Sequence, residues 1–582
     1  MSQRNPKDAM KPVNKSDHDL GVLRHSAAHL LAHALIELYP ATQLTIGPAT
    51  ENGFFYDVLP EHNFKEEDLP RIQERMHEIS KRNLPITHEA MAKADARALY
   101  KNNPFKLELI DGIPGDTVGI ARQGDFYDLC KGGHVASTGD IKHFKLEAIS
   151  GSYWRADRNN QALQRISGTA FWTESDLNTY EQRKEDALRY DHRKLGKQLD
   201  LFSFHDESVG SVFFHHKGKI IINLMMNYLR GLLDAADYQE ISTPILLNAS
   251  LWKQSGHYAH YKHNMYLCEI EGEEFAIKPM NCPGSILVYK ERPHSYRELP
   301  IRLAEFGIDH RYELSGVLHG LMRVRSFTMD DAHIYCTLEQ LEQEIININN
   351  MVYTVYRKFG FDTVKVYVST RSANSMGSEQ QWATATTVLT NALEKTCTKY
   401  EIQEGEGAFY GPKIEFHIQD SMGRSWQCGT VQVDFPQPEN FDLTYVTSAG
   451  TKERPVMIHR AIYGSIERFL AILLEHHKGN LPFWIAPVQV KVLTITDDQK
   501  AYARALAHHF KSHGIRVIVD ESSEQISAQI KVAQLERVPW MLVIGKKEVE
   551  NNSVTLRLLD GKQEFGLKAD ALLARAQELN RG

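Results

Sequence analysis

The chain has 582 residues, more than the roughly 100 to 200 of one typical domain, so we expect several domains. With 42% hydrophobic and 24% charged residues, the composition excludes a fibrous or disordered chain, and the net charge of −7 argues against a general nucleic-acid binder. No apolar run reaches the roughly 20 residues of a membrane-spanning helix, and residues 1–20 form a polar tail, so we expect a cytoplasmic protein without a membrane anchor. The 6 cysteines show no paired framework, so each is expected to be a thiol or a metal ligand.

A first domain is expected at residues 21–173. It opens with apolar residues at helical spacing between Leu23 and Leu35, which predicts a buried helix. Short strand-like runs follow at residues 54–58 and 126–130. Residues 173–200 interleave Arg, Lys, Glu and Asp, which predicts a long helix, and we place a helical linker at residues 174–200.

The middle segment, residues 201–486, mixes apolar helical patterns with strands that stand among long irregular connections. This pattern is typical of an antiparallel active-site sheet with inserted helices. The clearest elements are a helix at residues 220–236 and strands at residues 275–279, 364–368 and 413–418.

The last segment, residues 487–582, is expected to be a small α/β domain with parallel strands, because β-rich runs alternate with helical patterns. It carries a small excess of Lys and Arg over Asp and Glu, a weak indication of RNA contact. The β-rich runs are residues 488–495, 515–519, 540–545 and 553–559.

Three arginines in the middle segment suit the transfer of a nucleotide. Arg311 and Glu313 end one strand-like run, Arg323 precedes the next, and Arg468 follows Gly464. Charge grows on the α-phosphate during adenylation and on the departing pyrophosphate, and the planar fork of arginine can bind both. Each arginine taken singly would more often be a surface ion pair, but the combination favours a phosphate site.

These residues resemble the three signature motifs of the class II aminoacyl-tRNA synthetases. The motifs match as a strand ending near Pro244, Arg311 to Glu313 with its loop to Phe327, and Gly464 to Arg468. The resemblance to threonyl-tRNA synthetases covers nearly the whole chain. It implies an α+β multidomain protein with an N-terminal α+β editing domain, a central class II antiparallel-sheet catalytic domain and a C-terminal α/β anticodon-binding domain.

The resemblance also implies the reaction and its partners. The enzyme would activate L-threonine with ATP and Mg²⁺ and transfer it to the 3′ end of tRNA(Thr), as a homodimer with Pro244 at the interface. By the same likeness Arg311 would hold the α-phosphate and Glu313 the adenine side of ATP. Arg323 and Arg468 would hold the γ-phosphate.

A scattered metal set is suggested by Cys282, His333 and His459. From spacing alone, a buried thiol and two core histidines would be the commoner interpretation. The resemblance instead implies that these residues are Zn²⁺ ligands, one ion per chain. Three protein ligands leave an open position, which is the pattern of a catalytic rather than a structural zinc.

Substrate choice follows from that open position. Threonine and valine are nearly isosteric, and shape alone separates such pairs by about 100-fold at best, whereas a zinc ion that takes the amino group and the hydroxyl rejects valine. Asp331 would accept a hydrogen bond from the hydroxyl. Positions around the amino acid and the adenylate are matched by Met280, Tyr410, Lys413, Gln427 and Gln432. This chain has Met329 where the family usually has Gln, so one polar contact is in question.

Serine escapes the zinc filter, because it has the same polar groups and lacks one methyl, a difference of about 1 to 3 kcal/mol. A second, hydrolytic site is therefore expected. His25 and His29 lie one helical turn apart, and Cys130 and His134 follow further on, a set that suits either a metal or acid–base chemistry.

The resemblance favours acid–base chemistry in that set. These residues, together with Asp128, would bind the 3′ end of mischarged tRNA and position water for deacylation. Tyr56 and Lys145 would lie near the same pocket. In the last segment Glu548 and Arg557 match positions that read anticodon bases.

Two departures from the family accompany these matches. Residues 523–525 are Ser-Glu-Gln where the family usually has Asn-Glu-Lys, so contacts of that helix with the anticodon are expected to differ. The chain also begins with a polar tail where bacterial relatives usually carry a small β-rich domain.

Three alternatives remain at this point. A class II synthetase for proline or serine would lack the set of Cys282, His333 and His459. A non-catalytic RNA-binding paralogue would have little reason to keep Arg311 and Arg323 with Arg468. A free-standing hydrolase of mischarged tRNA would use the first segment alone.

Overall fold

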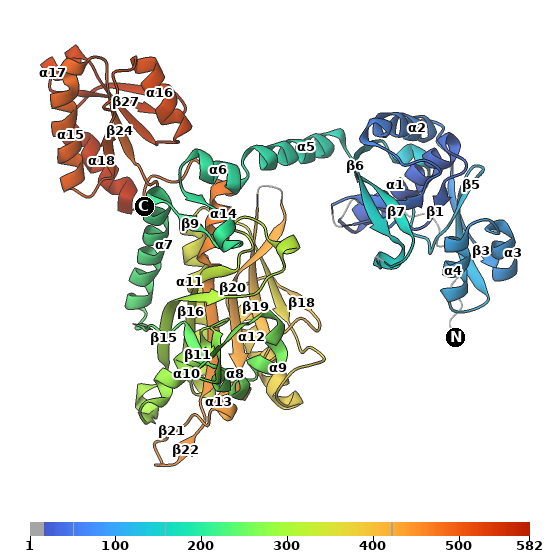
Figure 1. The fold of residues 1–582 in the computed structure, drawn as a ribbon, viewed down its shortest axis with the longest axis horizontal. Coiled ribbons are helices and arrows are strands. Elements are labelled where there is room, and N and C mark those ends of the chain that lie inside the picture. Colours follow the sequence, from blue (N-terminus) through green and yellow to red (C-terminus); the bar gives the residue numbers. More distant parts are fainter. Residues whose placement is uncertain (1–16, 51, 158, 421–422, 582) are drawn as a thin grey trace. The chain divides into compact units, whose positions relative to one another are not determined.

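The computed structural model describes residues 17–50, 52–157, 159–420 and 423–581. It divides into two compact units, Met1–Lys184 and Glu185–Gly582, and each is described by itself (Figure 1). None of the described helices is long and apolar enough to cross a membrane.

In the first unit the helix α1 (Asp17–Leu38) lies in the centre of the hydrophobic core. Its apolar residues at helical spacing, among them Leu23, Ala27 and Leu31, are fully buried. The helix packs against α2 (Leu69–Lys81) and against a four-stranded sheet of order β1-β2-β7-β6. The strands of this sheet are β1 (Gln43–Leu44), β2 (Phe54–Leu59), β6 (His143–Tyr153) and β7 (Ala162–Phe171).

A second, three-stranded antiparallel sheet completes this unit. Its strands are β3 (Ile86–Ala92), β4 (Thr117–Gln123) and β5 (Phe126–Leu129), and the short helices α3 (Lys93–Leu99) and α4 (Pro104–Gly112) accompany them. Strand β5 ends where a loop rich in glycine begins, and it contacts α1. The expected strands at residues 54–58 and 126–130 are therefore present within a residue of their ends.

The expected long linking helix is two helices. The segment folds as α5 (Glu174–Arg189) and α6 (His192–Gln198). Between them Asp191 adopts ψ 129°, outside the helical region, and its carboxylate accepts the backbone N–H of Arg193 as an N-cap. The charge pattern indicated the helical content, but the capping side chain starts a new helix there.

The second unit is built on an eight-stranded sheet of order β10-β15-β16-β23-β20-β19-β17-β18. The pairs are antiparallel except at the two edges, where β10 with β15 and β17 with β18 run parallel. The strands are β10 (Gln239–Glu240), β15 (Ile301–His310), β16 (Ser326–Cys336), β17 (Val364–Ser369), β18 (Glu401–Gln403), β19 (Lys413–Gln419), β20 (Ser425–Asp434) and β23 (Val456–Ser465).

Side chains alternate between the two faces of this sheet. In β16, Ala332, Ile334 and Cys336 join the largest hydrophobic core, whereas Asp331 and His333 point to the opposite face. The core face is covered by helices that bury their apolar sides against these strands. The helices of this part are α7 (His216–Ala235), α11 (Leu338–Lys358), α12 (Glu379–Lys395) and α14 (Ile466–His476).

Shorter elements surround the sheet. The short strands are β8 (Phe202–Ser203), β9 (Phe213–Phe214), β11 (Leu246–Asn248), β12 (Tyr266–Ile270), β13 (Glu273–Ile277), β14 (His294–Ser295), β21 (Tyr445–Val446) and β22 (Lys452–Glu453). The short helices are α8 (Ala249–Gln254), α9 (His257–Tyr261), α10 (Cys282–Lys290) and α13 (Pro436–Asn440).

The C-terminal part has its own five-stranded sheet, order β25-β24-β26-β27-β28. The strands are β24 (Val490–Thr494), β25 (Val517–Val519), β26 (Trp540–Ile544), β27 (Val554–Leu558) and β28 (Gln563–Leu567). The helices are α15 (Lys500–Ser512), α16 (Ile526–Leu535), α17 (Lys546–Glu550) and α18 (Ala569–Arg581). Strands β25, β24 and β26 are parallel, but β27 and β28 are antiparallel, so the expectation of parallel strands holds for part of the sheet. The connections before β27 and β28 are too short for a parallel crossover.

A bulge interrupts the pairing of β16 with β23 between Met329 and Asp331. The carboxylate of Asp330 fills it, because its two oxygens accept the backbone N–H groups of Ile462 at 2.8 Å and Gly464 at 2.9 Å. Arg460 donates to the carbonyl of Asp330 at 2.8 Å. One buried acidic side chain thus replaces the ladder hydrogen bonds that the extra residues of β23 cannot make.

Asp330→Ala should therefore destabilise the core sheet by about 3 kcal/mol, because two buried backbone donors lose their acceptors. Asp330→Asn keeps one carbonyl oxygen and should lose about half as much. Urea unfolding of the two variants beside the wild type measures both values. Equal, negligible losses in the two variants would contradict the role of the carboxylate.

Candidate functional site

A cavity of about 580 Å³ opens on the face of the eight-stranded sheet opposite the hydrophobic core. We call it the core cavity. It brings together residues from both ends of the central strands and from the loops beside them. Of the site residues expected from the sequence, its lining includes Met280, Cys282, Arg311, Glu313, Arg323, Asp331, Tyr410, Lys413, Gln427, Gln432, His459 and Arg468.

One row of side chains crosses the floor of this cavity. Lys413 pairs with Gln432, Gln432 with His459, and His459 with His333 in the register of four adjacent strands. Residues directly opposite in antiparallel strands carry their side chains on the same face. The sheet therefore places the two histidines side by side, with ring centroids 5.0 Å apart.

Cys282 completes a candidate metal group with these histidines. It begins helix α10, and one ligand atom each of Cys282, His333 and His459 lies within 4.8 Å of the others. Nε2 of His333 is buried and has no hydrogen-bond partner among the described residues. Nε2 of His459 is bonded to a carboxylate oxygen of Asp434 at 2.9 Å, the kind of outer contact that orients metal-bound histidines.

The electrostatics of this group fit a cation. Burial lowers the pKa of His333 well below its ordinary value, so the ring stays neutral and keeps a lone pair to donate. Burial and nearby carboxylates raise the pKa of the Cys282 thiol, so a bound cation is needed to hold a thiolate there. One sulfur and two nitrogens are a donor set that Zn²⁺ accepts, with a fourth position left open.

Three arginines line the same cavity. Arg311 donates from Nε to the carbonyl of Pro279 at 3.1 Å and lies against the ring of Phe327. Arg323 donates to the carboxylate of Glu313 at 3.0 Å. The remaining donors of both guanidinium groups face the cavity lining, where an anion can be bound by several charge-assisted hydrogen bonds.

Arg468 joins them from the first turn of α14. It donates to the carbonyls of Met322 at 3.0 Å and Gln427 at 3.1 Å. Burial lowers its pKa, and the charges of Arg311 and Arg323 add to that shift. The three arginines carry more positive charge than the nearby carboxylate of Glu313 balances. Binding of a polyphosphate would therefore stabilise this site.

Gly464 lets the chain pass close to β20 beside these arginines. It adopts φ 72°, and a Cβ there would lie 2.5 Å from the carbonyl oxygen of Cys428. A side chain at this position would clash with the backbone, so only glycine can occupy it without strain. The sequence analysis expected backbone room for a nucleotide here, and the structure shows that the neighbouring strand takes part of that room.

Other polar groups also line the cavity. The hydroxyl of Tyr410 donates to Gln432 at 2.5 Å, and Lys413 forms an ion pair with Glu415. Asp331 accepts a hydrogen bond from Asn281 at 3.4 Å, and burial raises its pKa. Met329 also lines the cavity, which puts a thioether where a polar side chain was in question.

Among the residues near the candidate metal group that the sequence analysis missed are His257 and Asn281. His257 is fully buried with Nε2 3.5 Å from Sγ of Cys282, and Asn281 bridges Asp331 and Asp309. Asn281 stands next to Cys282 in the chain, which was a usable signal. Nothing in the sequence around His257 distinguishes it from the neighbouring His260 and His263.

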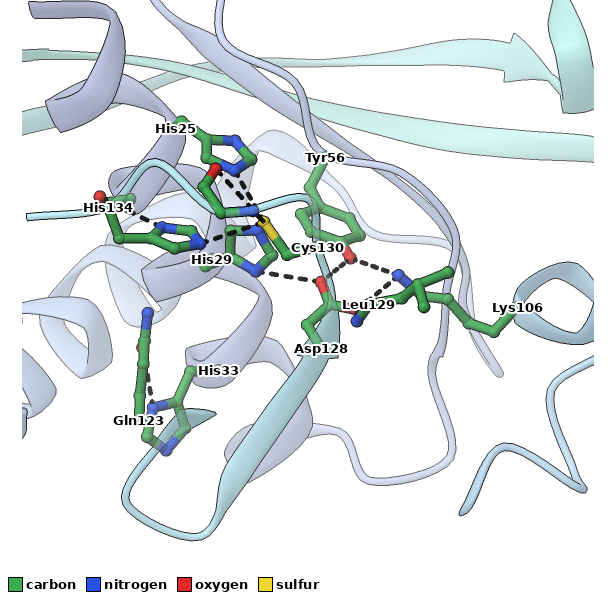
Figure 2. Close-up of polar contacts among 12 residues, drawn as sticks. His25, His29, His33, Tyr56, Lys106, Gln123, Asp128, Leu129, Cys130 and His134 are labelled. Atoms are coloured by element: carbon green, nitrogen blue, oxygen red, sulfur yellow. Dashed lines mark hydrogen bonds and ion pairs between the residues drawn. The ribbon is translucent and has the colours of Figure 1, made fainter. Parts of the chain in front are cut away.

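The first unit holds a second constellation, which we call the His–Cys cluster: His25, His29, Cys130 and His134 (Figure 2). Sγ of Cys130 lies 3.1 Å from Nε2 of His25 and 3.1 Å from Nε2 of His134. The backbone N–H of Gly132 donates to the same sulfur at 3.3 Å. The rings of His25 and His134 stack, with centroids 4.7 Å apart.

The hydrogen bonds of the cluster favour a thiolate. Burial alone would raise the pKa of Cys130, but hydrogen bonds from His134, His25 and His29 lower it to about 3. Burial alone would lower the pKa of His29, but Asp128 and Cys130 raise it to about 9. At neutral pH the cluster therefore contains a thiolate and an imidazolium in contact.

Asp128 anchors the cluster from strand β5. Its carboxylate lies 3.1 Å from Nδ1 of His29 and accepts hydrogen bonds from Tyr56 and from the ammonium of Lys106. The side chain of Lys106 is 3% exposed, and sequence analysis gave no sign of it, because a single lysine in an amphipathic helix is normally solvated. Lys145, expected near the pocket, pairs with Glu181.

A cluster of this kind can bind a polar ligand and activate water. Burial lowers the pKa of His134, so its neutral ring keeps a nitrogen lone pair that can accept a proton. The same four ligand atoms could alternatively saturate a metal ion, so both interpretations of the sequence remain compatible with the contacts.

The expected anticodon residues lie in the C-terminal sheet and beside it. Glu548 accepts hydrogen bonds from the N–H of Gly545 and the hydroxyl of Thr555, so it caps its own helix α17. Arg557 lies in β27, and its buried Nε has no hydrogen-bond partner among the described residues. Residues 523–525, which differ from the usual family sequence, lie just before α16.

Three family models match the chain. Residues 266–477 match the tRNA synthetase class II core domain (G, H, P, S and T), and residues 486–579 match an anticodon binding domain. Residues 118–167 match the threonyl and alanyl tRNA synthetase second additional domain. The last match includes Asp128, Cys130 and His134.

Curated relatives carry a consistent name. The threonine--tRNA ligase of Clostridium tetani is 51% identical over 96% of this chain and 87% of its own length. That of Acetivibrio thermocellus is 52% identical over 92% of this chain and 84% of its own. Among solved structures, the RNA binding domain of threonyl-tRNA synthetase from Cryptosporidium parvum has a TM-score of 0.65 at 42% identity, covering 67% of this chain and 98% of that one.

The His–Cys cluster makes a spectroscopic prediction. Because the pKa of Cys130 lies at about 3, the ultraviolet absorbance of its thiolate should be present at neutral pH and disappear only as the pH falls toward 3. The difference spectrum between the wild type and Cys130→Ser, followed over pH, isolates this thiol from the other cysteines. A thiolate that appears only in alkali would contradict the ion pair.

Proposed function

The chain belongs to the threonyl-tRNA synthetase family, and on that premise we propose that it activates L-threonine with ATP and transfers it to tRNA(Thr). The observation that carries the proposal is the core cavity, whose lining combines Cys282 and His459 of the candidate metal group with three arginines. An amino acid bound at the metal group and a triphosphate bound by the arginines would meet in this cavity. The alternative of a non-catalytic RNA-binding protein leaves this arrangement without a purpose.

For ATP, the three arginines would divide the phosphates. Arg311, fixed by the carbonyl of Pro279, lies beside the α-phosphate, and its charge stabilises the five-coordinate phosphorus of the transition state. Arg323 and Arg468 neutralise the γ-phosphate and so favour the departure of pyrophosphate together with Mg²⁺. Glu313, which pairs with Arg323, would contact the adenine side. Gln427 lies beside Arg468.

For threonine, the metal group supplies selectivity. A Zn²⁺ ion held by Cys282, His333 and His459 would provide a Lewis-acid position for the amino group and the hydroxyl. Asp331, whose raised pKa reflects its burial, would accept the hydroxyl hydrogen bond. Valine has no hydroxyl, so its binding would leave these buried groups unpaired. A pocket that selects by shape alone contains no such groups and could not reject valine in this way. Contacts around the amino acid would come from Met280, Tyr410, Lys413 and Gln432.

Serine passes this filter, and the His–Cys cluster would correct the error. His25, His29, Cys130 and His134, with Asp128 behind them, would bind the 3′ end of Ser-tRNA(Thr) and position water for hydrolysis. The Cys130 thiolate and the His29 imidazolium hold each other in place, and His134, whose pKa is lowered by burial, remains available as a proton acceptor. Metal-free chemistry is favoured because a four-ligand ion would leave no position for water.

Two further partners follow from the same family. Glu548 and Arg557 would read bases of the anticodon loop, Glu548 as a hydrogen-bond acceptor and Arg557 as a donor. A homodimer would use the apolar side chains next to Pro244, where Ile245 is 44% and Leu246 is 41% exposed. The sequence analysis expected a strand that ends near Pro244, but the strand before it, β10, already ends at Glu240. Work in translation would place the enzyme in the cytoplasm.

Amino-acid-dependent exchange of labelled pyrophosphate into ATP tests activation. Exchange should be strong with threonine, weaker with serine and absent with valine, because only the first two carry the hydroxyl. A zinc chelator should abolish it, and Cys282→Ser should lower it by at least about 100-fold. Strong exchange with proline, or full activity after metal removal, would sink the threonine-specific zinc filter.

Deacylation of Ser-tRNA(Thr) tests the second site. His25→Ala should slow hydrolysis by about 100-fold, the usual contribution of one acid–base group, and leave threonine-dependent exchange unchanged. Cys282→Ser is the matched control, because it should show the reverse pattern. Hydrolysis without any amino-acid-dependent exchange in the wild type would favour the free-standing hydrolase.

A further inference from the structure

The loop between β15 and β16, residues 311–325, carries two of the three arginines, and its fixation involves a residue outside the core cavity. His192, the first residue of α6, is fully buried beneath this loop. Its Nε2 accepts the backbone N–H of Leu321 at 3.1 Å. A backbone N–H can only donate a hydrogen bond, so Nε2 must be the ring nitrogen without a proton. Nδ1 therefore carries the ring proton and donates it to the carboxylate of Glu475 at 2.8 Å.

Glu475 connects the same loop to helix α14. Its carboxylate also accepts the backbone N–H of His192 at 3.2 Å. Arg468, two turns earlier in the helix, donates to the carbonyl of Met322 at 3.0 Å. Two consecutive residues of the loop are therefore held from the two ends of one helix, Leu321 through His192 and Met322 directly.

The held residues form a tight turn whose far side carries Arg323. The N–H of His319 donates to the carbonyl of Arg323 at 3.1 Å, and the N–H of Met322 donates to the carbonyl of His319 at 2.9 Å. Leu321 and Met322 are buried. Any freedom of this turn would be transmitted to the guanidinium of Arg323, which is itself half exposed.

Gly320 supports the same conclusion. It adopts φ 49°, and a Cβ there would lie 2.2 Å from Nε2 of His192. The imidazole thus occupies the space that a side chain at position 320 would need. The contact between ring and loop depends on glycine at this position.

A metal role for His192 is not supported, although one ligand atom each of Asp191, His192 and Glu475 lie within 4.8 Å of one another. Both ring nitrogens are already engaged in short hydrogen bonds. The carboxylate of Asp191 caps α6 and binds the guanidinium of Arg193. The group is satisfied as a hydrogen-bonded tether.

We propose that His192 is a positioning residue for ATP: through the hydrogen bond from its Nε2 to Leu321 it pre-orders the turn that presents Arg323 to the triphosphate. The inference rests on the proposed activation of threonine by ATP. Without the bond, the turn must be ordered when ATP binds, so part of the binding free energy is lost. The amino-acid end of the core cavity does not depend on this bond.

Two substitutions separate the contacts of His192. The side-chain amide of asparagine lies near the position of Nδ1, so His192→Asn keeps the hydrogen bond to Glu475 and loses the one from the N–H of Leu321. The side-chain amide of glutamine reaches the position of Nε2, so His192→Gln keeps an acceptor for the N–H of Leu321 and loses the side-chain hydrogen bond to Glu475. Both remove one hydrogen bond and leave similar volume, which makes each the control of the other.

Pyrophosphate exchange with purified full-length protein gives the readout. His192→Asn should raise the KM for ATP about tenfold, with the KM for threonine within about twofold of the wild type, and His192→Gln should stay within about threefold for both. Equal effects of the two variants on ATP, or an equal rise in the KM for threonine, would overturn the positioning role. Thermal unfolding of both variants measures any loss of the fold.

Gly320→Ala is the second test, should His192→Asn fail to fold. Its Cβ displaces the ring from Leu321 without altering His192, and it should reproduce the ATP-selective rise. An unchanged KM for ATP in this variant would overturn the inference alone. Absence of threonine-dependent exchange in the wild type would overturn the proposed function itself, which keeps the two failures distinct.

Discussion

The alternation of side chains along antiparallel strands is the constraint on which the core of this synthetase depends. In β16 every second residue enters the hydrophobic core, so Asp331 and His333 lie on the opposite face of the sheet, where Asp331 lines the cavity. The register with β23 then sets His459 beside His333, and β20 adds Gln432 to the same row. The burial that stabilises the sheet therefore also places the metal group, and neither can be changed without the other.

The two constellations of the chain treat a buried cysteine in opposite ways. Around Cys282 the neighbouring charges are carboxylates and burial disfavours a thiolate, so the pocket favours an incoming cation. Around Cys130 three histidines donate to the sulfur, and the positive charges of His29 and Lys106 are balanced by the Cys130 thiolate and the Asp128 carboxylate. The pocket around Cys282 needs a bound cation to balance a thiolate, whereas the charges around Cys130 are balanced by side chains of the protein itself. This difference suits an ion-dependent filter at one site and hydrolysis without an ion at the other.

Much of this architecture was accessible from the sequence, because local signals carry it. The family resemblance and the α+β multidomain class are confirmed, and the helices α1 and α7 and the strands given bounds in the sequence analysis lie within a few residues of those bounds. What remained hidden depends on contacts between distant segments. Lys106 is buried only because Asp128 lies opposite, and the Asp191 cap that divides the linker is one polar residue among many. The antiparallel pair β27 and β28 required knowledge of which strands are neighbours.

The bulge at Asp330 separates two parts of the sheet that would otherwise share one register. On one side lie His333 and His459, and on the other lie Gly464 and the start of α14. In an uninterrupted ladder, inserting one residue into β23 would turn every later side chain to the opposite face. Here the mismatch is absorbed within the bulge, so the register that pairs His333 with His459 does not depend on how many residues β23 carries beyond it. One continuous sheet thus holds two stretches whose geometries are set separately.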